Sequence, residues 1–169
     1  NGGCMPQGVA GIVAEVRPKV RTPLGIHAHN DMDLAVANSL AAVEAGCIQV
    51  QGTLNGFGER CGNADLSTII GLLSAKLGYE TLPKAKLKGL KEACYYISEV
   101  ANLPIADYHA FIGHSAFAHK AGVHIDAILK NARAYEHLDP TTFGNHRRLI
   151  TSELAGKMRG LYAASFNKF

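Results

Sequence analysis

The chain has 169 residues, of which 47% are hydrophobic and 18% charged, and its formal net charge is +3. This length fits one domain or part of a larger one, and the scattered charges argue against a nucleic-acid partner. No apolar run reaches the roughly 18 residues of a membrane-spanning helix and no signal peptide opens the chain, so neither a membrane nor secretion is indicated. The four cysteines lack paired spacing, which favours reduced thiols and a cytoplasmic protein.

The chain opens with alternating helical and extended patterns. Apolar residues recur at helical spacing over residues 6–16, and the short apolar run 24–28 is typical of a strand. A second helix follows, for which we expect Asp31 or Asp33 as the cap and Gly46 as the end.

The alternation continues with a strand over residues 48–54, a glycine-rich loop over 55–63 and a helix over 66–77. Parallel strands joined by helices define an α/β fold. Two strands alone can neither close a barrel nor cover both faces of a sheet, so we expect the last strands and helices of a partial (β/α)8 TIM barrel, or a half-sheet.

The second half changes character. An amphipathic helix is predicted over residues 85–101, and three histidines then fall within residues 114–124, which is unusual for a segment that only packs. We expect small helical elements there and a last helix from about residue 154. The predicted organisation is therefore a barrel segment over residues 1–83 and a small helical subdomain, with its linker, over 84–169.

The most informative motif is His27-Ala28-His29, followed at once by Asn30-Asp31. In a strand, alternate side chains point to the same face, so both imidazoles would aim at one spot. That spot lies at the carboxyl end of a strand, where α/β folds bind ligands, and two imidazoles form half of a divalent-metal site. The other interpretation is two histidines held by ordinary hydrogen bonds.

The glycine-rich loop brings Glu59, Arg60 and Asn63 close to the same strand end. It matches neither a phosphate-binding loop nor a dinucleotide fingerprint. An amide oxygen of Asn63 could complete a metal shell, and Glu59 could carry a proton. Alternatively, Glu59 and Arg60 form a structural ion pair and Asn63 caps the next helix.

Taken together, these segments resemble the family of 2-isopropylmalate, homocitrate and citramalate synthases. The segments that carry the resemblance are residues 25–46, 50–64, 115–124 and 135–140. Three shorter pieces are most similar to the citramalate synthases: residues 50–53, 59–63 and 144–148.

The resemblance implies a metal-dependent Claisen-type condensation. The acetyl group of acetyl-CoA is added to the keto carbon of a 2-oxo acid, and the thioester is then hydrolysed. Pyruvate is the acceptor in the citramalate branch, which serves isoleucine and branched-chain amino-acid biosynthesis; 2-isopropylmalate and homocitrate synthesis are the alternatives. The metal would be Mn²⁺, Mg²⁺ or Zn²⁺, and the protein a homodimer.

The resemblance also implies roles for particular residues. His27, His29 and Asn63 match metal ligands, and Glu59 matches an active-site carboxylate. His124 matches the histidine that helps to remove the methyl proton of acetyl-CoA, with Tyr135 as its companion. In these dimers the subdomain reaches into the partner's barrel, so His124 and Tyr135 would serve the other chain's site. A packed helix residue is the other interpretation of His124.

The chain departs from the family pattern in one important respect. It contains no aspartate–arginine–glutamate motif, which in the family supplies a further metal ligand and an arginine that polarises the substrate. We therefore expect the 169 residues alone to be inactive. Two other readings are a stand-alone binding or assembly module that pairs through exposed strand edges, and a related lyase or aldolase, against which residues 115–124 argue.

Overall fold

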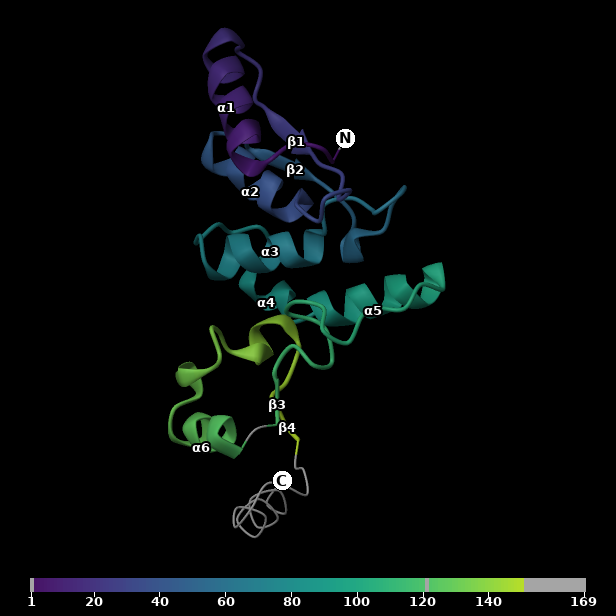
Figure 1. Cartoon of the computed structure of the whole chain (residues 1–169), viewed down its shortest axis with the longest axis vertical. Coiled ribbons are helices and arrows are strands. Elements are labelled where there is room, and N and C mark those ends of the chain that lie inside the picture. Colours follow the sequence, from purple (N-terminus) through teal and green to yellow (C-terminus); the bar gives the residue numbers. More distant parts are fainter. Residues whose placement is uncertain (1, 121, 151–169) are drawn as a thin grey trace.

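The computed structural model describes residues 2–120 and 122–150. The chain runs from a half in which helices alternate with a parallel strand pair to a half of helices, turns and one pair of two-residue strands (Figure 1). The first half contains α1 (Pro6–Val16), η1 (Arg17–Lys19), β1 (Gly25–His27), α2 (Ala35–Glu44), β2 (Gln49–Gln51), η2 (Leu54–Gly56) and α3 (Leu66–Ala75). The second half contains α4 (Lys84–Leu87), α5 (Leu90–Ala101), β3 (Ala118–His119), α6 (Gly122–Lys130), η3 (Ala132–Ala134), η4 (Pro140–Phe143) and β4 (Arg148–Leu149).

The first half has the predicted α/β order. Strands β1 and β2 pair in parallel, with His27 opposite Gln51, and α2 makes the crossover between them. Small and branched side chains fill the space between the sheet and helices α2 and α3. This core consists of Ala28, Ala35, Ala64, Ile69 and Leu73. It fixes the carboxyl end of β1, where the paired histidines lie.

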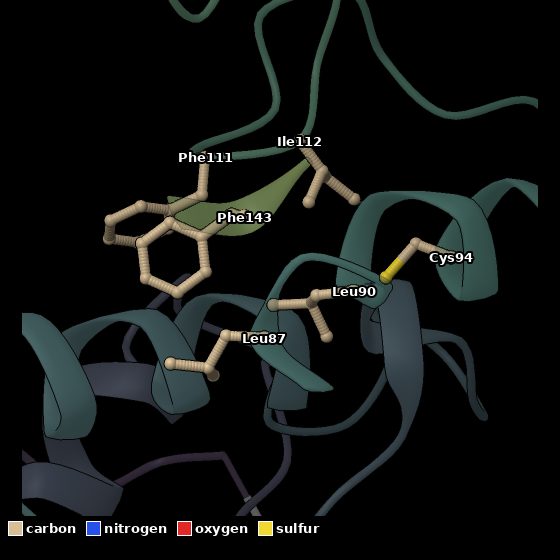
Figure 2. Close-up of a cluster of buried hydrophobic side chains, with 6 residues drawn as sticks. All are labelled: Leu87, Leu90, Cys94, Phe111, Ile112 and Phe143. Carbon is tan, nitrogen blue, oxygen red and sulfur yellow. The ribbon is translucent and has the colours of Figure 1, made fainter. Parts of the chain in front are cut away.

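A second core joins α4, α5 and the segment that follows them (Figure 2). Its buried members are Leu87, Leu90, Cys94, Phe111, Ile112 and Phe143. The rings of Phe111 and Phe143 meet edge to face with centroids 5.2 Å apart, a favoured aromatic geometry. Burial raises the pKa of the Cys94 thiol to about 11, so this cysteine packs as an apolar residue.

Two local predictions were wrong. The helix α2 is not capped by an aspartate: the Oδ1 atom of Asn30 accepts a hydrogen bond from the backbone N–H of Ala35 at 3.0 Å, while Asp33 adopts a positive φ of 58°. The single helix expected over residues 85–101 is broken into α4 and α5 at Gly89, where the chain turns.

The second half is less purely helical than expected. The two-residue strands β3 and β4 pair in parallel, with Ala118 opposite Arg148 and His119 opposite Leu149. The last helix, expected from about residue 154, lies outside the described residues. Among the helices that the structure describes, none combines the length and apolarity needed to cross a membrane.

Candidate metal centre

The two imidazoles of the H-x-H motif lie next to each other at the carboxyl end of β1. The ring centroids of His27 and His29 are 5.0 Å apart, with the rings at 79° to one another. His27 ends the strand and is exposed, whereas His29 is half-buried just beyond it. The two-residue period of an extended chain therefore places both rings on one face, as the sequence predicts.

Asn63 is brought to the same face by a backbone bridge. His29 and Asn63 form an isolated antiparallel pair, flanked by bonds from the N–H of Asn30 to the carbonyl of Gly62 and from Ala64 to Ala28, both 2.9 Å long. His29 and Asn63 exchange no backbone bond themselves, so they form the type of pair in which side chains approach most closely.

Two buried polar atoms at this point lack a hydrogen-bond partner among the residues that the structure describes. Within the described residues, neither Nδ1 of His29 nor Oδ1 of Asn63 has a hydrogen-bond partner. A buried polar group without a hydrogen-bond partner costs stability. Both atoms can give an electron pair to a divalent cation as metal ligands. The described residues contain no group of three or more His, Cys, Asp or Glu side chains suited to a metal. The candidate ligands at this point are two imidazoles and an amide oxygen.

The amide nitrogen of Asn63 fixes the orientation of its side chain. Its Nδ2 atom donates to the carbonyl oxygen of Phe57 at 3.3 Å. This bond leaves the oxygen as the free end of the amide. Asn63 does not cap the following helix, as the alternative interpretation had it, because Asp65 is the residue at that position.

Glu59 and Arg60 are not primarily a pair with each other. The Glu59 side chain is 86% exposed, and its carboxylate lies 3.8 Å from Arg60 Nη1. Arg60 instead holds Asp31 in a two-pronged contact, with Nε donating to Oδ1 at 2.7 Å and Nη2 donating to Oδ2 at 3.0 Å. This guanidinium lowers the pKa of Asp31 to about 2. The carboxylate engaged at the strand end is therefore Asp31, and Glu59 faces solvent.

Asp65 lies two residues beyond Asn63 and caps α3. Its carboxylate accepts hydrogen bonds from the backbone N–H groups of Ser67 and Thr68, and it also meets His109 Nε2 at 3.1 Å. Burial opposes the charge on Asp65, but the bonds from His109, Ser67 and Thr68 outweigh it and lower the pKa. In return, Asp65 raises the pKa of His109.

His124 and Tyr135 form a second group in a different part of the chain. Their ring centroids are 4.3 Å apart and both side chains are exposed. His124 belongs to α6, which lies at the opposite end of the molecule from β1 (Figure 1). The structure thus brings together His27, His29 and Asn63, and separately His124 and Tyr135, but it does not join the two groups within one chain.

A third polar group joins β3, the segment after η3 and the segment before β4. Arg147 donates to both carboxylate oxygens of Glu136 at 2.6 Å, and His119 Nε2 lies 3.2 Å from the same carboxylate. The Glu136 side chain is only 3% exposed, and the bonds from Arg147 lower its pKa in spite of the burial. This group fixes the turn that carries Tyr135.

Three residues close in the chain or in space to Asn63 or His29 were not singled out as site residues from the sequence: Asp31 as the partner of Arg60, Asp65 and His109. Asp31 carries a signal, because it directly follows the H-x-H-N motif. His109 carries none, since 44 residues separate it from Asp65 and only the folded chain brings them together.

Comparison with known proteins identifies the family. Residues 1–95 match the HMGL-like family model, and residues 111–164 match the model of the homocitrate synthase post-HMGL domain-like family. The chain therefore belongs to the HMGL-like family.

Individual relatives agree with this assignment. The chain is 49% identical over 157 residues to the (R)-citramalate synthase of Geobacter sulfurreducens and 48% identical over 158 residues to that of Aquifex aeolicus; each match covers 93% of this chain. The chain spans about 30% of the length of these two curated relatives. A solved HMG-CoA lyase from Bacillus subtilis has a similar fold, with a TM-score of 0.54 and 23% identity over 62% of this chain and 36% of the lyase.

Proposed function

We propose that the chain is part of a citramalate synthase, which condenses acetyl-CoA with pyruvate and hydrolyses the thioester. The observation that carries this proposal is that His27, His29 and Asn63 lie together in a chain similar to curated (R)-citramalate synthases. Among them, His29 Nδ1 and Asn63 Oδ1 have no hydrogen-bond partner within the described residues. On this proposal β1, α2, β2 and α3 belong to a (β/α)8 barrel over residues 1–83, and residues 84–169 form the linker and subdomain of a cytoplasmic homodimer.

The residues divide the chemistry between them. His27, His29 and Asn63 would hold a divalent cation, Mn²⁺, Mg²⁺ or Zn²⁺, which would supply Lewis acidity at the keto group of the acceptor. His124 accepts a proton from the methyl group of acetyl-CoA, with Tyr135 against its ring. The resulting carbanion forms the new bond to the keto carbon, and the carbonyl electron pair moves to the oxygen, which takes up a proton. Water then cleaves the thioester and releases the CoA thiol.

The separation of the two groups supports the dimer. Because α6, which carries His124, lies at the other end of the molecule from β1 (Figure 1), His124 and the Tyr135 ring beside it would serve the metal site of a second copy. Glu59 stays a candidate for a proton-carrying role, and its 86% exposed side chain is free to turn toward a bound substrate.

Calorimetric titration with Mn²⁺ and Zn²⁺ tests the metal site. We expect binding of one ion per chain, lost in the double variant His27→Ala, His29→Ala. A folded chain that binds neither ion would contradict the site. The activity is tested in a longer polypeptide, in which this chain is joined to a segment that carries the aspartate–arginine–glutamate motif of the family. The assay measures the release of CoA from acetyl-CoA with pyruvate, 2-oxoisovalerate or 2-oxoglutarate as the acceptor.

Pyruvate should be the preferred acceptor. Preference for 2-oxoisovalerate or 2-oxoglutarate would favour the 2-isopropylmalate or homocitrate alternative. The 169 residues alone should turn over acetyl-CoA more than about 100-fold more slowly than the longer polypeptide, because they lack the arginine of the aspartate–arginine–glutamate motif. Turnover by the isolated chain close to that of the longer polypeptide would contradict this expectation.

A further inference from the structure

We propose that the ion pair of Asp31 and Arg60 is a clasp that fixes the glycine-rich loop, residues 55–63, in the shape that turns Asn63 toward His27 and His29. Asp31 and Arg60 would then be positioning residues of the metal centre. This inference rests on the proposed metal site.

The clasp joins the two segments that carry the metal-ligand candidates. Asp31 is two residues after His29, and Arg60 is three residues before Asn63. The guanidinium spans both carboxylate oxygens at 2.7 and 3.0 Å. A two-pronged contact of this kind fixes orientation as well as distance. Any shift of the loop relative to β1 must therefore break it.

The backbone at the clasp is held in an unfavourable conformation. Arg60 has a positive φ of 54°, which residues other than glycine seldom adopt, and Gly62 follows with a φ of 98°. Such a residue stays in that region only where its surroundings hold it. The Asp31 carboxylate holds the Arg60 side chain more closely than Glu59 does, at 2.7 Å against 3.8 Å, so the ion pair and the turn support each other.

The backbone of the loop contacts the candidate ligand Asn63 directly. A Cβ atom on Gly58 would lie 2.5 Å from Nδ2 of Asn63, so no space separates the loop backbone from the amide. Phe57, beside Gly58, accepts the bond from that same Nδ2. Movement of the turn at Arg60 is therefore passed on to the Asn63 side chain.

The clasp is too exposed to contribute much to global stability. The side chains of Arg60 and Asp31 are 47% and 30% exposed, and ion pairs of that exposure add little to the free energy of unfolding. Its effect should therefore appear in metal affinity rather than in the unfolding midpoint. This separates a positioning role from a merely structural one.

The test compares the Mn²⁺ affinity of the full 169-residue chain with that of Asp31→Asn, Arg60→Gln and the double variant. Each single variant should bind Mn²⁺ about 10- to 100-fold more weakly, as expected when a group that orients a ligand is lost. The double variant should be no weaker than the singles, because the two residues act as one unit. The matched control is Glu15→Gln, which removes the exposed pair between Glu15 on α1 and Lys19 in η1 and should leave the affinity unchanged.

The outcomes separate the clasp from the metal site. If Asp31→Asn binds Mn²⁺ as tightly as the wild-type chain does, the clasp is overturned and the metal site still stands. If the wild-type chain binds no Mn²⁺, the metal site fails and the role of the clasp toward it fails as well. Hydrogen exchange without metal adds an independent check: the amides of Gly62 and Asn63, bonded to Glu59 and Gly56, should exchange at least about tenfold faster in Asp31→Asn. Equal exchange would overturn the clasp.

Discussion

The Nε2 atom of His109 lies 3.1 Å from Oδ2 of Asp65, and the two side chains are 16% and 14% exposed. The Asp65 carboxylate thus serves two elements, since it caps α3 and also anchors the segment that follows α5. The segment that leads to α6 is thereby attached two residues from Asn63. One mostly buried carboxylate, two residues after the candidate ligand Asn63, therefore links α3 to the second half of the chain.

Replacement of His109 should weaken this attachment. In His109→Ala the Asp65 carboxylate loses its only imidazole partner among the described residues but stays mostly buried, so we expect a loss of about 1–3 kcal/mol in the free energy of unfolding. Urea denaturation followed by circular dichroism measures it. The control His146→Ala changes an exposed histidine and should have little effect. Equal losses in the two variants would contradict the prediction.

Glu136 should make stability depend on pH. Its pKa is held below the ordinary value of 4.5 by Arg147, with His119 also facing the carboxylate. A lowered pKa gives stabilisation that is complete above pH 4.5 and is lost as the pH falls through the folded-state pKa. At pH 7 Glu136→Gln should therefore be less stable by about 1–3 kcal/mol.

The difference between wild type and Glu136→Gln should shrink as the pH is lowered below 4.5, because only the wild type then loses a charge at this position. Urea titrations from neutral to acid pH measure this difference. A gap that stays constant with pH would show that the carboxylate charge is not the source of the stabilisation.

Asn145 should be among the most sensitive polar residues of the second half. Its side chain is 4% exposed, donates to the carbonyls of Phe111 and Gly113, and accepts from Lys91 Nζ and from the backbone of His146. Asn145→Ala removes all four of these hydrogen bonds, although the Gly113 carbonyl still accepts from the N–H of Ala116, and should cost at least about 2 kcal/mol.

The control for Asn145 is Asn131, which caps η3 from an exposed position. Asn131→Ala should cost about 1 kcal/mol or less. Chemical denaturation of both variants measures the loss in the free energy of unfolding. A larger loss in Asn131→Ala than in Asn145→Ala would contradict the role given to Asn145.

Gly62 should tolerate no side chain. Its φ is 98°, and a Cβ atom would lie only 2.1 Å from the carbonyl oxygen of Gly56. Gly62→Ala should destabilise the chain by about 1–3 kcal/mol and weaken Mn²⁺ binding, since the contact is with backbone and cannot be relieved by a rotamer. Gly8→Ala is the matched control: Gly8 lies in α1 with nothing within 4 Å of a Cβ, so stability should rise by about 0.5–1 kcal/mol. Equal Mn²⁺ affinity in both variants would contradict the prediction.

Local pattern was enough to predict the first half and its paired histidines. The helical spacing over residues 6–16 matches α1, and the two-residue period places His27 and His29 on one face. The cap of α2 was missed because Asp31 is engaged by Arg60, a residue 29 positions away. A short-range rule for helix caps cannot detect such competition.

The remaining errors also come from contacts between distant segments. The break between α4 and α5 lies where Gly144 packs against Lys88: a Cβ on Gly144 would meet the Lys88 carbonyl oxygen at 2.2 Å. The pairing of β3 with β4 involves only two residues on each strand. Strands this short carry no recognisable alternation, so no sequence pattern indicated them.

The contact between His124 and Tyr135 also offers an optical probe. The chain has six tyrosines and no tryptophan, so a single indole introduced at this contact would have no other indole to mask its fluorescence. Tyr135→Trp keeps an aromatic ring beside His124 while reporting the polarity around it. Burial of this end of the chain by a second copy would then be visible as a change in emission, independently of any catalytic assay.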